Sequence, residues 1–536
     1  MTRFNARGTR PATSSPVTTT REPTRTHEGG AGHLRTAHSE LYLLAVTNMV
    51  GQDTYYERGG QRDDRYTQLV RQLAVEDPAW TAGLLGWLRG PGSMRTASLV
   101  GAAEFVHARL AAAKGDSGLG HQAAIEQQDA GWNRRVISSV LQRADEPGEL
   151  LAYWTSRYGR AIPKPIKRGI EDAVGSLYTE RSLLKYDTDS KGYRFGDVIE
   201  LVHPMPKATW QGDLFKHAID RRHGRGEEPP LTLPLLQTRA ALAEWPLEKR
   251  RQLVARPDAA DTLAHAGMTW EALAGWLQGP MDRQAWEAII PSMGYMALLR
   301  NLRNFDEAGV SDEVAEQVAK RLSDAEQVSG SRQFPFRFLA AYKHAPSLRW
   351  GHALEKALGY SLANVPALPG RTLVLVDRSG SMFGGVSERT QLNRADSAAL
   401  FGTAVAARAE QADLVEFGTT SHPVPLRKSE SILRVLDRFH ELGGTNTTAA
   451  VQAHYRGHDR VLIVTDEQAS YSYYGDPTAQ VPANVPVYTW NLAGYQAGHG
   501  PSGAGNRHTF GGLTDAAFRM VPLLEASRSA RWPWEK

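Results

Sequence analysis

Two carboxylates and three hydroxyls stand where they could bind a hard metal ion. The pattern D-x-S-x-S occupies residues 377–381, directly after the apolar run TLVLV. Asp466 follows a second apolar run, RVLIVT, and Thr445 lies in the glycine-containing segment GGTNTT. A set of oxygen ligands without Cys or His suits Mg²⁺ or a similar ion rather than zinc or copper. The predicted ligands of this divalent cation are Asp377, Ser379, Ser381, Thr445 and Asp466.

The two carboxylates are expected to meet at one edge of a β-sheet. TLVLV, DLVEF, RVLIVT and VPVYTW are short apolar runs that alternate with helical stretches, which is typical of right-handed βαβ crossovers. Such crossovers make a mainly parallel, doubly wound sheet, and ligands gather outside the carboxyl ends of its strands. The alternative is an ordinary Ser-Gly-Ser turn in which Asp377 only caps a helix.

Residues 37 to about 365 are predicted to be helical almost throughout. In SELYLLAVTNMVG, Leu41, Leu44, Ala45 and Met49 recur at the spacing of an amphipathic helix, and similar stripes follow as far as FRFLAAYKHA. Many short helices with short connections are typical of an α-solenoid of stacked, HEAT-like helix pairs, here without a fixed period. The chain is therefore expected to be mostly α, with an α/β domain after the proline-bearing linker NVPALPG.

The first 36 residues differ from the rest in composition. Six arginines against two glutamates give this segment a charge of +4, which equals the net charge of all 536 residues. With Thr, Ser, Pro and Gly between the charges, the segment is predicted to be a flexible basic arm. It is either a solvated tail or a segment attracted to polyanions.

Two further basic clusters lie in sequence that should be folded. KHAIDRRHGR at 216–225 opposes its cations with Asp220 alone, and RYGRAIPKPIKR at 157–168 contains no acid. Each cluster alone is commonly a solvated helix face, but two clusters and a basic arm favour contact with an RNA or DNA backbone. The cations of the second run are Arg157, Arg160, Lys164, Lys167 and Arg168.

Several classes of protein are disfavoured. The chain has no cysteine, so it has no disulfides, thiol nucleophile or Fe–S cluster. It has no P-loop, no GxGxxG after a strand and no Ser/His/Asp arrangement, so no enzyme is predicted. The N-terminus has no apolar signal region, and no apolar run approaches 18 residues. We therefore expect a cytoplasmic protein without a membrane segment, and a monomer.

The predicted cation ligands resemble the metal-ion-dependent adhesion site of the von Willebrand factor A family. In that family the serines and the threonine meet the ion, and the aspartates ligate it directly or through water. The helical part resembles the TROVE module of Ro ribonucleoproteins in THEGGAGHLRTAHSELYLLAVTNMVGQDTYYE (26–57), YMALLRNLRNFDEAGV (295–310) and FPFRFLAAY (334–342). A TROVE module followed by an A-type domain is the Ro architecture, and the resemblance covers about residues 26–530.

The Ro resemblance implies a domain order and a set of partners. The expected order is the basic arm at 1–36, a ring-shaped TROVE module at 37–366, an A-like domain at 367–530 and a C-terminal tail at 531–536. In the family, the ring binds small noncoding Y RNA on a basic outer surface, and single-stranded ends of misfolded RNA enter a central cavity. A Y-like RNA and a 3′→5′ exoribonuclease such as polynucleotide phosphorylase are the partners that this implies.

The segment KYDTDSKGYRFGDVIELVHPMPK (185–207) is similar to the family's RNA-binding segment. By that similarity His203 and Lys185 match the family's RNA-contacting histidine and lysine. The family's arginine corresponds by spacing to Ser190 or Lys191, while Arg194 is the closest arginine. Without the family, a histidine before a proline is more often a satisfied loop residue.

Two functions follow from these observations. The first is an RNA-binding scaffold for RNA quality control or degradation, which would recognise shape and single-stranded ends. The alternative is a metal-dependent protein-adhesion module, in which the A-like domain grips an acidic partner and the helical part is only a platform.

Overall fold

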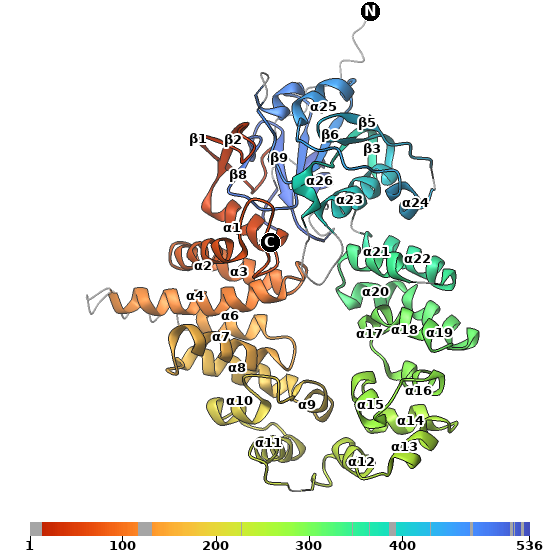
Figure 1. Ribbon diagram of the computed structural model, residues 1–536. Coiled ribbons are helices and arrows are strands. Elements are labelled where there is room, and N and C mark those ends of the chain that lie inside the picture. Colours follow the sequence, from red (N-terminus) through yellow and green to blue (C-terminus); the bar gives the residue numbers. More distant parts are fainter. Residues whose placement is uncertain are drawn as a thin grey trace, which may run out of the picture.

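The computed structural model describes residues 13–115, 131–226, 228–345, 347–363, 365–384, 393–428, 430–471, 475–514, 518, 520–526 and 530–535. Two arms of helices and a six-stranded sheet form this part of the chain (Figure 1). None of the described helices combines the length and the apolar character needed to cross a membrane. The predicted fold class, a mostly helical solenoid followed by an A-like α/β domain, is confirmed.

The first arm packs its helices around one apolar core. Asp77 accepts a hydrogen bond from the Trp80 amide at 3.2 Å, and Pro78 occupies the first turn, so α3 begins there. This core also includes Trp532 near the C-terminus. The helices are α1 (Ala37–Thr47), α2 (Gly59–Glu76), α3 (Pro78–Arg89), α4 (Arg95–Gly115), α6 (Trp132–Val140), α7 (Glu146–Tyr158), α8 (Lys164–Leu177), α9 (Glu180–Tyr186), α10 (Phe195–Val202) and α11 (Thr209–Arg222).

The second arm continues from α11 and returns toward the sheet. Its core is shared with one face of the sheet, and Phe334 packs against the cores of both arms. The helices are α12 (Pro234–Ala243), α13 (Leu247–Val254), α14 (Ala259–His265), α15 (Trp270–Leu277), α16 (Arg283–Ile289), α17 (Tyr295–Arg300), α18 (Leu302–Glu307), α19 (Asp312–Leu322), α20 (Ala325–Ser331), α21 (Pro335–His344) and α22 (Gly351–Ser361), with 3₁₀ turns η1 (Ile290–Ser292) and η2 (Leu348–Trp350).

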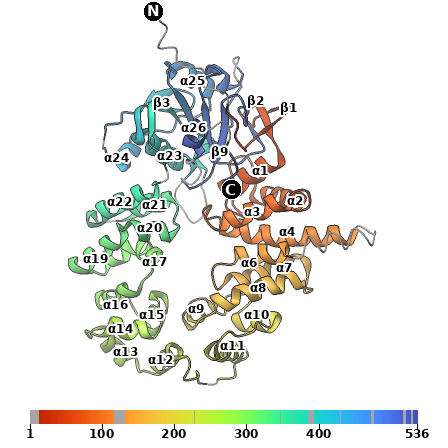
Figure 2. The same ribbon diagram turned by 180° about the vertical axis from the view of Figure 1, so that it is seen from behind.

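The helices follow a ring that the α/β domain closes. Figures 1 and 2 agree that the arms lie opposite each other, meet between α11 and α12, and both reach the domain at their other ends. A hydrogen bond of 2.7 Å from Arg332 to Gln142 also joins the arms directly.

The α/β domain is a six-stranded sheet in the order β5-β4-β3-β6-β7-β9. All its strand pairs are parallel except β4 with the short β5. The apolar run of β3 is continuous because its alternate side chains fill two cores, one under α23 and one under α25. The strands are β3 (Leu368–Asp377), β4 (Ala409–Phe417), β5 (Ser421–Pro423), β6 (Arg460–Thr465), β7 (Val487–Asn491) and β9 (Arg507–Gly511), and the helical elements are η3 (Gly380–Phe383), α23 (Arg394–Arg408), α24 (Ile432–Leu436), α25 (Thr447–His454), η4 (Pro477–Gln480) and α26 (Met520–Ala526).

The expected flexible arm at 1–36 is wrong for residues 13–36. β1 (Thr19–Arg25) and β2 (Ala31–Arg35) form an antiparallel hairpin, and β2 pairs with β8 (Ala497–Gly498) of the α/β domain. The buried Arg35 guanidinium forms an ion pair with buried Glu467, which fixes the hairpin to this domain. The first twelve residues of the predicted arm lie outside the described residues.

Candidate functional site

The sheet brings the two predicted aspartates to one edge. β3 and β6 are parallel neighbours, with Val376 opposite Val464, so the residues that end these strands lie side by side. Asp377 is the last residue of β3, and Asp466 follows β6. The chain leaves β3 toward β4 on one side and β6 lies on the other, so this edge is the topological switch point of the sheet.

The loop after β3 folds back on its own aspartate. Asp377 accepts hydrogen bonds from the Ser379 amide at 2.8 Å and from the Thr465 hydroxyl at 2.5 Å. The hydroxyl oxygens of Ser379 and Ser381 are 3.2 Å apart. The Gly380 amide donates to the carbonyl of Gly443 at 2.6 Å, which places the loop that carries Thr445 against the serines.

The loop after β6 closes the other side of the site. The Ser470 amide and hydroxyl both donate to the carbonyl of Thr445, at 2.8 and 2.6 Å. The Gln468 amide donates to one Asp466 carboxylate oxygen at 3.1 Å. All five predicted cation ligands are therefore in one place, and each is at most 5% exposed.

The two carboxylates would repel each other strongly without a counter-ion. Burial raises the pKa of Asp377, and burial together with the charge of Asp377 raises the pKa of Asp466 to about 7. The Asp466 Oδ2 atom is buried and has no hydrogen-bond partner of good geometry among the described residues. A divalent cation would offset both costs, so the donor set fits a hard ion.

Of the predicted RNA-binding cations, those around the start of α8 have no ion-pair partner in the described part of the chain. Arg160, Lys164 and Arg168 are exposed, Lys167 is half-buried, and none of the four forms an ion pair with a described residue. Ile166 and Ile170 of the same helix are buried, so burial of this apolar face turns the cations away from the core. The helix N-terminus adds a partial positive charge at the same place.

The other predicted RNA-binding residues have different surroundings. Arg157 pairs with buried Glu104 at 3.2 Å, and Lys191 pairs with two carboxylates, those of Asp145 and Glu149. These contacts neutralise much of the charge that phosphates would need.

The remaining three predicted RNA-binding residues are spread over α9 and α10. Arg194 pairs with Asp187 and Asp189. His203 ends α10 in an exposed left-handed conformation with a φ of 54°. Lys185 lies in a cavity of about 410 Å³ with residues of α17 and α20, so it faces the second arm.

The other basic cluster, KHAIDRRHGR at 216–225, is largely neutralised as well. Arg221 lies 3.4 Å from Asp187, and Arg222 lies 2.8 Å from Asp197. Arg225 lies 3.1 Å from Asp220. This cluster is a solvated, ion-paired helix face rather than a free positive surface.

A basic groove on the second arm is not among the sites that the sequence predicted. A cavity of about 340 Å³ lies between α17, α18 and α21, lined by Met296, Leu299, Arg300, Arg337 and His344 among others. Burial, and then the charge of Arg300, lower the pKa of Arg337. Neither guanidinium forms an ion pair with a described carboxylate. The sequence did contain a feature that could have indicated this groove, because Arg300 and Arg337 lie in two of the segments that resemble the TROVE module.

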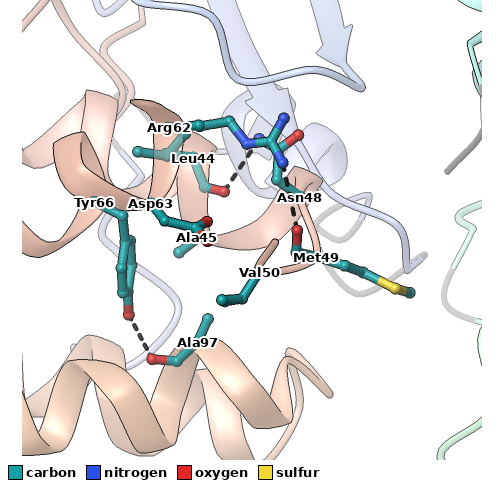
Figure 3. A pocket seen from close by; sticks show the side chains of 9 residues that line it. All are labelled: Leu44, Ala45, Asn48, Met49, Val50, Arg62, Asp63, Tyr66 and Ala97. Carbon is teal, nitrogen blue, oxygen red and sulfur yellow. Dashed lines mark hydrogen bonds between the residues drawn. The ribbon is translucent and has the colours of Figure 1, made fainter. Parts of the chain in front are cut away.

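The loop between α1 and α2 is held against the α/β domain. Arg62 of α2, 1% exposed, donates to the carbonyl of Met49 at 3.4 Å and to that of Gln52. Asn48 donates to the carbonyl of Ala493 at 2.8 Å, beyond β7. Figure 3 shows the Arg62 guanidinium next to Asn48 and the Met49 carbonyl. The cavity there, about 10 Å³, holds at most one water, so these contacts fix the loop rather than bind a ligand.

Comparisons with known proteins agree with this architecture. Residues 267–350, in the second arm, match the model of the TROVE domain. The Ro (RSR) protein of Deinococcus radiodurans has a similar structure, with a TM-score of 0.60 and 17% identity, over 92% of this chain and 100% of that chain.

Two curated relatives share shorter segments. Telomerase protein component 1 of Mus musculus is 34% identical over 121 residues, which are 22% of this chain and 4% of that protein. The protein of that name from Rattus norvegicus is 46% identical over 59 residues, which are 11% of this chain and 2% of that protein. The match thus spans a small part of either relative.

The fold defines a class of proteins in which an α/β domain closes a ring of helices. Within that class the chain is Ro-like: it has the fold of a Ro protein and carries a TROVE domain in its second arm.

Proposed function

We propose that this chain is the RNA-binding scaffold of a Ro-type ribonucleoprotein. The observation that carries the proposal is a patch of four cations around the start of α8 that form no ion pair with a described residue, Arg160, Lys164, Lys167 and Arg168, which we call the α8 patch. Charges without protein partners are free to neutralise phosphates, and the resulting attraction does not depend on RNA sequence. The TROVE match and the Ro fold support an RNA ligand rather than another polyanion.

The α8 patch is suited to the body of a structured RNA. Its cations lie on the first helix turn of α8 and the segment before it. Cations placed in this way would contact the phosphate backbone of an RNA rather than the edges of its bases. We propose a small noncoding, Y-like RNA as the ligand of this surface, with His203 and Lys185 as additional contacts.

The groove with Arg300 and Arg337 is suited to a single-stranded RNA end. It combines two guanidinium groups that form no ion pair with a described carboxylate with the apolar side chains of Met296 and Leu299. Unpaired bases stack on apolar and guanidinium surfaces while cations follow the backbone. Misfolded RNA with a free end would then be held for degradation, with a 3′→5′ exoribonuclease such as polynucleotide phosphorylase as the partner that acts on it.

The α/β domain is proposed to hold a divalent cation, most simply Mg²⁺. The five oxygen ligands, their burial and the unpartnered Asp466 oxygen support this assignment. A bound ion would neutralise the carboxylates and stabilise the domain. We assign no proton transfer or bond cleavage to this site. The role that we propose for the chain is that of a scaffold rather than an enzyme.

Sequencing the RNAs that copurify with the full chain tests the main proposal. Small structured RNAs should be enriched, and the variant Lys164→Glu, Lys167→Glu, Arg168→Glu should lose them. An Asp377→Asn variant should keep them, because the cation site lies in the other domain. A wild-type preparation that is folded and free of RNA, and that binds no added structured RNA, would contradict the proposal.

A further inference from the structure

The solvent side of the candidate cation site is covered by residues from outside the α/β domain. Tyr56, in the loop between α1 and α2, has its hydroxyl close to Ser381 and to the charge of Asp466. A Cβ on Gly384 would lie 3.9 Å from the Tyr55 amide, so this loop runs directly over the end of η3. The site is therefore covered by the first arm of the ring.

Tyr56 is held over the site by the N-terminal hairpin. Its hydroxyl donates a hydrogen bond to the carboxylate of Glu28, in the turn between β1 and β2. Its ring stacks on His27 of the same turn, with centroids 4.8 Å apart, and lies 5.5 Å from the ring of buried Tyr495. The phenol group thus has both a fixed plane and a fixed hydroxyl direction.

The turn that carries Glu28 is bound to the loop after Asp466. The Thr26 hydroxyl donates to the carbonyl of Ala469 at 2.7 Å, and the His27 amide donates to the Gln468 side chain at 2.8 Å. Gly29, which has a φ of 79°, forms a β-bridge with Ser470. The same loop holds Thr445, so the hairpin turn and the predicted cation ligands form one hydrogen-bonded unit.

We infer that Tyr56 and Glu28 complete the candidate cation site from within the chain, in the position that an acidic partner would otherwise occupy. Tyr56 closes the site, and Glu28 orients its hydroxyl. The site then joins three parts of the chain, namely the hairpin, the first arm and the α/β domain. This assignment rests on the proposed cation, and it disfavours the adhesion module, because an outside carboxylate would have to displace Tyr56.

Manganese relaxation measurements on the full chain test this inference. Water-proton relaxation by bound Mn²⁺ reports how many waters reach the ion, and a titration gives its affinity. Tyr56→Phe and Glu28→Gln should each raise the relaxation enhancement and weaken Mn²⁺ binding about tenfold. They should also make the site responsive to added acetate, to which the wild-type site should not respond. Tyr55→Phe and Glu22→Gln are matched controls, because both residues are exposed, Tyr55 is next to Tyr56 in sequence, and Glu22 lies in β1 of the hairpin that carries Glu28.

The outcomes separate this inference from the proposed cation site. Wild-type Mn²⁺ binding that Asp466→Asn abolishes supports the site itself. If the Tyr56 and Glu28 variants then match their controls in relaxation, affinity and acetate response, the internal closure is wrong and the cation site stands. If folded wild-type protein binds no Mn²⁺, both are wrong, while the RNA-binding proposal is unaffected.

Discussion

The α8 patch makes a quantitative prediction about salt. The variant Lys164→Gln, Lys167→Gln, Arg168→Gln removes three cations that form no ion pair with a described residue, and glutamine has a helix propensity close to that of lysine and arginine. Each phosphate that loses its cation reduces the slope of log affinity against log salt by about 0.7 to 0.9. If each side chain neutralises one phosphate, the slope should become shallower by about 2 to 3.

The slope difference translates into a measurable change in affinity. Between about 50 and 200 mM salt, wild-type affinity for a structured small RNA should fall about 20- to 40-fold more than that of the variant. Filter binding or fluorescence anisotropy at several salt concentrations gives both slopes, and circular dichroism melting checks that the variant is folded.

A control with the same change in net charge makes the result specific. Arg222, Arg256 and Arg283 are exposed, and each already pairs with a carboxylate, at 2.8, 2.5 and 2.9 Å. Replacing these three by glutamine also removes three positive charges but should leave the slope close to that of wild type. Equal slopes for all three proteins would refute the α8 patch, and equal reductions in both variants would show that net charge alone matters.

Four further outcomes are expected. Arg300→Gln with Arg337→Gln should weaken binding of a single-stranded oligonucleotide about tenfold and leave a blunt duplex unaffected in anisotropy titrations. Asp466→Asn should raise the Tm of cation-free protein, because burial and Asp377 disfavour the ionised carboxylate, and should abolish any rise in Tm on adding Mg²⁺. Burial lowers the pKa of His508 to about 4, so below about pH 6.5 the unfolded chain binds more protons than the folded chain. The free energy of unfolding, measured in denaturant melts, should therefore fall by about 3 kcal/mol as the pH is lowered toward 4. The fall should be smaller in His508→Gln. Trp532→Ala should cost about 3 kcal/mol in the same melts, because Trp532 packs in the core of the first arm.

The strands that the sequence predicted well are those with both faces buried. RVLIVT is β6 without a change of boundary, and TLVLV lies inside β3, because a continuous apolar run is the local signature of such a strand. β9, which contains the polar residues Arg507 and His508, was missed because that signature is absent.

The hairpin at the N-terminus could not be predicted from local sequence. Its arginines and threonines have the composition of a disordered tail, and its second strand pairs with residues more than 460 positions away. Arg35 is buried because Glu467 neutralises it, and that partner is visible only in three dimensions. Composition predicts disorder when a segment is considered alone, and here the missing apolar contacts are replaced by a distant strand and a buried ion pair.

The two kinds of candidate site also differ in whether local sequence is enough to predict them. The cation ligands were predictable because three of them lie within five residues and the others end or border neighbouring elements of one sheet. The RNA-binding cations were harder to predict, because a cation is available to phosphates only where no carboxylate of the chain lies nearby. Lys191 and Arg194 were predicted and form ion pairs, while Arg300 and Arg337 were not predicted and form no ion pair with a described carboxylate.

Charge pairing also explains how a chain with a net charge of only +4 can attract RNA. The three arginines of the 216–225 cluster are neutralised within a few ångströms, so they contribute little beyond one Debye length. Two groups of cations that form no ion pair with a described carboxylate are the α8 patch on the first arm and the Arg300–Arg337 groove on the second. Because these two places lie on opposite arms, the proposed function predicts that an RNA with a folded body and a free end would engage both, whereas a short duplex would engage only one. Selectivity for damaged or misfolded RNA would then come from the placement of charge around the ring and would need no reading of bases.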